Sequence, residues 1–175
     1  HPADCATALR AKGARRIVLL ARAGTEATSP DAIAAVDLVL PPPLKGDRLA
    51  IVSNGLGPAM LAIDKLISAG GKLAEFSAET QAALHRSEVD MSKPGENPVD
   101  LGGNASPERF VQALEIVASD ANVDAVLVVH APTRMAPSLV TAQALIDNRK
   151  KFRRNLLTSW MGLKEALNAR HACNL

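Results

Sequence analysis

The stretch that decides the fold runs from residue 48 to residue 58 and reads Arg-Leu-Ala-Ile-Val-Ser-Asn-Gly-Leu-Gly-Pro. Its apolar run, Leu49 to Val52, predicts a short buried strand. Gly55 and Gly57 allow a tight turn, and Pro58 is favoured in the first turn of a helix because its missing N–H leaves no hydrogen bond unmade. Such a strand, turn and helix place free backbone N–H groups where a phosphate or carboxylate can bind.

Outward from this stretch, apolar runs alternate with helical patterns. The alternation predicts an α/β fold, a three-layer flavodoxin-like or Rossmann-like sandwich built around a parallel sheet. The segment 87–103 contains several Gly and Pro residues and is expected to be irregular. The predicted strands are 48–53, 72–76, 125–130 and 155–159, and the predicted helices are 58–69, 78–86, 107–119, 138–150 and one that starts at Lys164.

The beginning of the chain has a weaker pattern. Residues 3–12 predict a short helix and 16–21 a buried strand, whereas 32–40 are ambiguous. The triplet Pro41-Pro42-Pro43 breaks any element and predicts a stiff linker. We therefore expect an N-terminal segment over 1–43 and a succinyl-CoA ligase-like flavodoxin-type domain over 44–175. The last helical pattern has no stop signal, so we expect that domain to be truncated at its C-terminus.

Composition excludes several classes of protein. The net charge is +2 over 175 residues and aromatic residues make up 2%, which argues against stacking on nucleic acid. The apolar runs are too short to span a bilayer, and the start has no secretory signal, so a cytoplasmic location is expected. Cys5 and Cys173 lack metal-type spacing. Two reduced thiols are the favoured interpretation and a disulfide is the alternative.

The carboxyl ends of the predicted strands are the place to look for a ligand. In open parallel sheets, ligands bind beyond these ends. The loops 53–57, 130–134 and 159–162 follow predicted strands, and we expect them to converge although they lie far apart in the sequence. No catalytic residue and no metal ligand is predicted. The candidate ligand-binding residues for a phosphate or an acyl group are Ser53, Asn54, Gly55, Gly57, Asn97, Asp100 and His130.

Each candidate has a structural alternative. The glycine turn can simply connect a strand to a helix. Pro98 disfavours helix at Asn97, so Asn97 and Asp100 can pin the neighbouring turn as well as contact a ligand. His130 ends a strand, where proton transfer is possible. Because no nucleophile or carboxylate partner is identified beside it, a hydrogen-bonded structural role is favoured.

Two further features have a structural and a functional interpretation. The basic run 149–154, Arg-Lys-Lys-Phe-Arg-Arg, ends a predicted helix, where cations suit the helix dipole. A solvated face is the favoured interpretation, and an acidic partner or a CoA phosphate is the sharper alternative. Trp160 is interpreted as filler of the core or of a domain interface rather than as a stacking platform.

From about Leu44 to the end, five motifs in order resemble the NDP-forming acyl-CoA synthetases, which are relatives of succinyl-CoA ligase. Each motif is weak alone, whereas their order and spacing are specific. They are Lys-Gly-Asp-Arg-Leu-Ala-Ile-Val-Ser-Asn-Gly at 45–55, Leu-Ala-Glu-Phe-Ser-Ala-Glu-Thr at 73–80, Glu-Asn-Pro-Val-Asp-Leu at 96–101, Asp-Ala-Val-Leu-Val-Val-His-Ala-Pro at 124–132 and Leu-Thr-Ser-Trp-Met-Gly at 157–162.

The resemblance implies a flavodoxin-like domain that follows CoA-binding and phosphohistidine domains. The run Leu-Leu-Thr-Ser-Trp-Met-Gly at 156–162 is similar to bacterial fusion proteins that carry a GNAT lysine acetyltransferase domain. For the parent protein the family implies CoA or acyl-CoA and ADP or ATP as ligands. Its partners would be the CoA-binding, phosphohistidine and ATP-grasp domains, and a homo-oligomer is possible.

Three family motifs are missing from the sequence. They are the Ser-His-Thr-Gly loop of the phosphohistidine, the ATP-grasp segment, and the Gly-x-Gly loop with which an acetyltransferase binds acetyl-CoA. No turnover is therefore expected from these residues alone. Two functions stay open: a contribution to the acyl-CoA or phosphate site of a synthetase, and a non-catalytic interaction or sensing module. An independent flavin-binding protein is a weaker alternative because aromatic residues are so few.

Overall fold

The computed structural model describes residues 37–39, 46–87, 89, 95–162 and 164–173. The helix predicted over 3–12, the strand predicted over 16–21 and the proline linker lie outside these residues, as does Cys5. The domain division at residue 43 and the state of the thiols therefore stay predictions.

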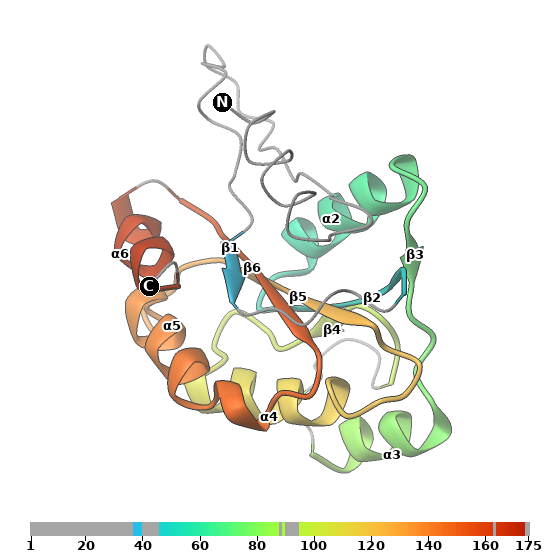
Figure 1. Ribbon diagram of the computed structural model, residues 1–175. Helices are drawn as coiled ribbons and strands as arrows, with labels where there is room; N and C mark the ends of the chain where they lie inside the picture. Colours follow the sequence, from blue (N-terminus) through green and yellow to red (C-terminus); the bar gives the residue numbers. More distant parts are fainter. Residues whose placement is uncertain (1–36, 40–45, 88, 90–94, 163, 174–175) are drawn as a thin grey trace.

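The strands form one 6-stranded sheet with the order β1-β6-β5-β2-β3, in which β4 also pairs with β2 (Figure 1). The described pairings are parallel except for β1, which is antiparallel to β6. The predicted α/β fold is confirmed. The sheet also has an antiparallel edge strand, β1, which lies within residues 32–40, where the sequence pattern is ambiguous. The strands are β1 Asp37–Val39, β2 Arg48–Ser53, β3 Lys72–Leu73, β4 Val99–Asp100, β5 Ala125–His130 and β6 Asn155–Trp160.

Helices cover both faces of the sheet (Figure 1). Side chains alternate along a strand, so Leu49 and Ile51 pack with α2 on one face, whereas Ala50 and Val52 belong to the larger core with α4, α5 and α6 on the other. The helices are α2 Leu56–Ser68, α3 Ala78–Ser87, α4 Pro107–Val117, α5 Ser138–Asp147 and α6 Lys164–Cys173, with a short 3-10 turn η2 at Arg149–Lys151.

The connections create a topological switch point between β2 and β5. From β2 the chain passes through α2 to β3 on one side, and it later reaches β5 on the other side of β2. Ligands in open α/β sheets bind in the crevice outside the carboxyl ends of the strands at such a point. The fold therefore points to the loops that follow β2 and β5.

Several element boundaries differ from the prediction. The helix predicted from Pro58 begins at Leu56, and the strand predicted over 72–76 is paired only at Lys72–Leu73. The segment 87–103 is not wholly irregular, because Val99–Asp100 forms β4. The lengths of β3 and β4 depend on pairing with β2, which a local pattern does not reveal. By contrast, the start of α4 is confirmed, with Ser106 accepting a capping hydrogen bond from the N–H of Arg109.

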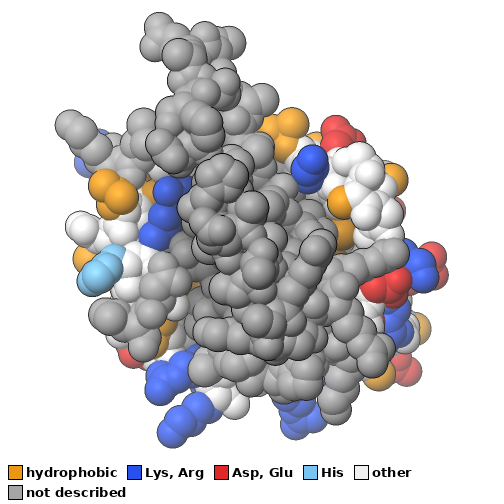
Figure 2. Space-filling model, turned by 45° about the horizontal axis from the view of Figure 1, so that its top comes forward, with side chains coloured by type: hydrophobic (Ala, Val, Ile, Leu, Met, Phe, Trp, Pro, Cys, Tyr) orange, Lys and Arg blue, Asp and Glu red, His pale blue; other side chains and the backbone are white. Residues whose placement is uncertain are grey.

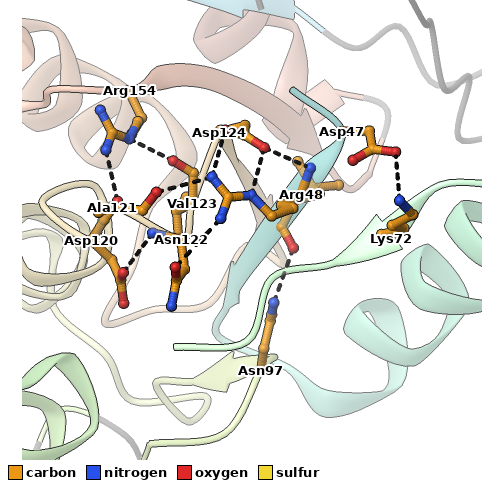
Figure 3. A network of polar contacts seen from close by, with 11 residues as sticks. Asp47, Arg48, Lys72, Asn97, Asp120, Ala121, Asn122, Val123, Asp124 and Arg154 are labelled. Carbon is orange, nitrogen blue, oxygen red and sulfur yellow. Dashed lines mark hydrogen bonds and ion pairs between the residues drawn. The ribbon is translucent and has the colours of Figure 1, made fainter. Parts of the chain in front are cut away.

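A polar network holds the amino ends of β2 and β5 together (Figure 3). The Arg48 guanidinium donates to both carboxylate oxygens of Asp124, at 2.9 and 3.0 Å, and to the backbone oxygen of Ala121. Arg154 donates to the carbonyls of Val123 and Asp120. This network lies at the opposite end of the strands from the switch point, so it supports the sheet without entering the candidate site.

Candidate functional site

The loops at the carboxyl edge converge as predicted. The Asn54 side chain donates to the backbone oxygen of Ala131 at 2.7 Å and accepts from the N–H of the same residue at 2.8 Å. The Ser53 hydroxyl donates to the backbone oxygen of Val129 at 2.8 Å, and the N–H of Met161 donates to the His130 carbonyl at 2.8 Å. Hydrogen bonds therefore join all three strand-end loops.

Ser53 and Asn54 are both buried and build the edge of the sheet. The Ser53 hydroxyl also accepts from the N–H of Gly55 at 3.1 Å. Both Asn54 amide atoms are used by Ala131, so this pair works as a clasp between the loop after β2 and the loop after β5. We call the two hydrogen bonds between Asn54 and Ala131 the loop clasp.

The glycines of the turn have ordinary backbone angles. Gly55 is the N-cap of α2 with φ −163°, which any residue adopts, and neither glycine is among those with positive φ. The two glycines allow this turn, but its backbone angles do not require them. A Cβ placed on Gly57 meets no atom within 4 Å, so what glycine supplies there is room beside the helix N-terminus.

Two backbone donors remain at this N-terminus. Ala59 is the first residue whose N–H bonds back, to the Gly55 carbonyl at 3.2 Å, and Pro58 has no N–H. In the described part of the chain, no acceptor is recorded for the N–H groups of Leu56 and Gly57. A helix N-terminus contributes about 0.3–1 kcal/mol per charge, and up to ~2 kcal/mol when partly buried. Because micromolar binding needs roughly 8 kcal/mol, other groups would have to complete an anion site.

Asp100 and Asn97 occupy different places on the flank of β2. Asp100 pairs with Ser53 in the register of β4, at the carboxyl edge, and one of its carboxylate oxygens accepts from the N–H of Gly102 at 3.0 Å. Asn97 lies nearer the amino end of β2. Its amide oxygen accepts from the N–H of Ile51, and its amide nitrogen donates to the carbonyls of Leu49 and Ala74, at 3.0 Å each. Asn97 therefore pins β2 and the segment after β3 and not the glycine turn, while ligand contact by either residue stays a prediction.

His130 faces the other layer of the molecule. It follows Val126 and Val128 on the side of β5 that packs against α4, and its ring centroid lies 5.5 Å from that of Phe110 and 4.8 Å from that of Trp160. The side chain is 0% exposed, and no hydrogen-bond partner for either ring nitrogen is found among the described residues. A buried role fits this position, but the predicted hydrogen bond is not seen.

Burial lowers the pKa of His130 to about 4, and the nearby backbone of Ala136 and of His130 itself offsets this only in part. The ring is therefore neutral at pH 7. A neutral ring buried against Phe110 and Trp160 is poorly placed to exchange protons with a ligand at the glycine turn, which leads into the helix on the other face of the sheet.

The basic run is at the amino edge of the sheet, remote from the switch point. Arg149 donates to the Ile146 carbonyl, and Lys151 pairs with Glu115 at 2.8 Å. On the face shown in Figure 2, Lys and Arg side chains are spread around the margin and form no single patch outside the grey residues. Trp160 is fully buried, with its indole N–H donating to Thr158 at 3.0 Å, which confirms its role as core filler.

Sequence reasoning missed Ala131 and Met161, whose backbone groups join the loops. Their side chains carry no signal, and only the rule that parallel strand ends meet could have indicated them. The described residues contain no group of three His, Cys, Asp or Glu side chains that could hold a metal ion. None of their helices is both long and apolar enough to cross a membrane.

No protein-family model matches the sequence. The acetate–CoA ligase (ADP-forming) I of Archaeoglobus fulgidus is 36% identical over 121 residues, which cover 69% of this chain and 18% of that protein. The 4-hydroxybutyrate–CoA ligase (ADP-forming) of Nitrosopumilus maritimus is 31% identical over 134 residues, or 74% of this chain and 18% of the relative. The homologues of this chain are ADP-forming acyl-CoA synthetases.

A solved structure of the same kind shares the fold. The dinucleotide-forming acetyl-coenzyme A synthetase 1 of Ca. Korarchaeum cryptofilum, in complex with phosphate and ADP, superimposes with a TM-score of 0.65 at 18% identity. The match covers 76% of this chain and 32% of that one. The resemblance to NDP-forming synthetases is thus confirmed at the level of homology. The chain spans about a fifth of the length of these curated ADP-forming relatives.

Proposed function

We propose that this chain is one α/β domain of an ADP-forming acyl-CoA synthetase-like protein, and that its carboxyl edge contributes to the acyl or phosphate site of the parent. The observation that carries the proposal is the switch point between β2 and β5. There no acceptor among the described residues is recorded for the N–H groups of Leu56 and Gly57, and a Cβ on Gly57 would meet no atom within 4 Å, in a chain 36% identical to an acetate–CoA ligase over 121 residues.

The parent would supply the rest of the chemistry. Two backbone donors are too few to hold CoA or a nucleotide, so the CoA-binding, phosphohistidine and ATP-grasp domains implied by the family would complete the site. CoA or acyl-CoA and ADP or ATP would be ligands of the parent. The described residues would position a ligand and leave the chemical step to the other domains of the parent.

Calorimetric titration of this chain with acetyl-CoA, CoA, ADP and phosphate tests the proposal. A dissociation constant below about 100 µM, roughly 5.5 kcal/mol, that is lost in Gly57→Val would support a ligand site at the turn. The new side chain enters open space, so the fold is kept. Ser68→Val adds the same side chain at the exposed far end of α2 and should bind like the wild type.

A second candidate is a non-catalytic module that assembles or senses through contact with other domains or a second copy. Exposed large apolar side chains favour it, because a domain that packs against others leaves such groups uncovered when it is alone. No heat with any of the four ligands would support this candidate and reject autonomous binding. The exposed side chains are Leu56, Met60, Leu61, Ile67, Met135, Leu139, Val140 and Leu167.

The GNAT fusion is a finer proposal about the parent. Its support is the run at 156–162, of which Trp160 is buried in the core. Incubation of the full parent with labelled acetyl-CoA and a lysine peptide should transfer the acetyl group if that domain is present. If no acetyl group were transferred while acyl-CoA-dependent ATP formation was intact, the parent would be a synthetase that has no acetyltransferase domain.

A further inference from the structure

The buried ring of His130 and the loop clasp belong to consecutive residues. His130 ends β5, and the next residue, Ala131, has both its N–H and its carbonyl bonded to Asn54, at 2.8 and 2.7 Å. A movement of the chain at His130 that brings the ring to water would therefore displace the backbone that Asn54 holds.

The ring of His130 is covered by two core side chains and by a loop that is partly exposed at the surface. Phe110 lies on α4 and Trp160 on β6, and both are buried in the main core. The remaining cover is the loop from Ala131 to Pro137, of which Ala136 lies beside the ring. Besides the loop clasp, this loop is held by two bonds between Thr133 and Ala136 and by the bond from the Thr141 N–H to the Pro137 carbonyl. Arg134 and Met135 between them are exposed, and no hydrogen bond with another described residue is recorded for either. Segments with few hydrogen bonds open at lower free energy than core strands.

We propose that His130 is a proton-sensitive latch: protonation of its ring favours opening of the 131–137 loop, which releases the loop clasp at the β2–β5 switch point. The neutral ring fits its apolar site, whereas a charged ring needs water or a partner. Opening the loop supplies water and at the same time separates Ala131 from Asn54. The step would free the turn in front of α2.

No acidic side chain is placed to stabilise the charged ring in the closed form. The elements around the His130 ring carry four described ionisable groups that bear on this point. They are Glu108 and Arg109, which are next to Phe110 in the sequence, Arg134 in the loop, and Arg170 on α6. Glu108 is exposed and interacts with Ser106, and Arg170 donates to the Trp160 carbonyl at 2.8 Å. None of these groups is recorded as acting on the charge of the His130 ring, whose pKa is lowered by burial alone and raised in part by the backbone of Ala136 and of His130 itself.

Hydrogen exchange of the Ala131 amide in the whole chain tests the latch. With a pKa of 6.5 in the open form and about 4 in the closed form, protection corrected for the intrinsic rate should fall about 20-fold from pH 7 to pH 5. The Val128 amide in the middle of β5 should remain better protected than Ala131 at both pH values. That difference shows local opening rather than global unfolding.

Three variants decide the cause. His130→Leu should abolish the fall, and His130→Phe, which keeps a ring in the site, should do so if the leucine variant does not fold. His85→Gln on the exposed face of α3 should keep it. A flat wild-type profile, a fall that survives both substitutions of His130, or joint exchange of Ala131 and Val128 would each overturn the latch. The effect of opening on ligand binding rests on the proposed function, whereas the exchange experiment does not.

Discussion

Asn97 lies at a gap on the edge of β2 that faces away from β5, between the pairings with β3 and β4. β3 pairs with Arg48 and Leu49, and β4 pairs with Val52 and Ser53. Between these pairings the Asn97 amide takes the place of a backbone, accepting from Ile51 and donating to two carbonyls. One side chain thus joins two short strands into a continuous edge.

Replacement of Asn97 should therefore be costly. Asn97→Ala removes three hydrogen bonds and leaves buried backbone groups unpaired, which should lower the free energy of unfolding by about 2–4 kcal/mol. Urea denaturation followed by circular dichroism measures it. Asn148→Ala, which removes one bond to the Ala144 carbonyl at the end of α5, should cost about 1 kcal/mol or less. Equal losses in the two variants would show that Asn97 does not bridge the sheet.

Two glycines in neighbouring segments offer a matched pair. Gly95 has φ +91°, and a Cβ there would lie 2.9 Å from the Cβ of Gln81. At Gly103 φ is not left-handed and a Cβ meets nothing within 4 Å. Gly95→Ala should destabilise the protein by about 1–3 kcal/mol, whereas Gly103→Ala should be neutral or gain about 0.4–1 kcal/mol. Thermal melts of both variants test this; a stable Gly95→Ala would mean that the segment holding it relaxes freely.

At the level of elements, the loop clasp is the contact that orders the switch point. Asn54→Ala removes both of its bonds and should destabilise the chain by about 2–3 kcal/mol. Asn54→Asp keeps an acceptor for the Ala131 N–H but loses the donor to the Ala131 carbonyl, so we expect a loss in unfolding free energy as well. Denaturant unfolding with exchange of the Ala131 amide measures both effects. Unchanged Ala131 protection in Asn54→Ala would exclude the clasp as its cause.

The elements that the sequence predicts well carry their own signals. β5 is a continuous apolar run, and α4 has Ser106 and Pro107 at its start. β4 is two residues long and exists only because Val99 and Asp100 meet the end of β2. The convergence of the strand-end loops followed from a rule about parallel sheets. The face on which His130 lies was not predicted, because it depends on the register and layer of β5.

At the level of the whole molecule, we expect the free energy of unfolding to fall with pH in two ranges, one set by paired carboxylates and the other by the buried His130. Arg48 bonds to the Asp124 carboxylate and holds its pKa below the usual 3.8, although burial opposes this. Burial acts to raise the pKa of Asp120, but the N–H groups of Asn122 and Ser77 hold it low. Groups with lowered acidic pKa stabilise the fold above about pH 4 and lose that effect as the pH falls further.

His130 acts in the range above this one. Its pKa is lowered from 6.5 to about 4 on folding, so the unfolded chain binds the proton more readily. Stability should therefore be complete above pH 6.5 and should fall by about 2–3 kcal/mol between pH 7 and pH 4. Urea titrations at pH 7, 5, 4 and 3 measure the curve. In His130→Leu the loss of unfolding free energy between pH 7 and pH 4 should disappear, while the loss below pH 4 remains. In Asp124→Asn the loss between pH 7 and pH 4 should remain, and the loss below pH 4 should become smaller. If the two variants gave parallel curves, the two ranges would not belong to these two groups.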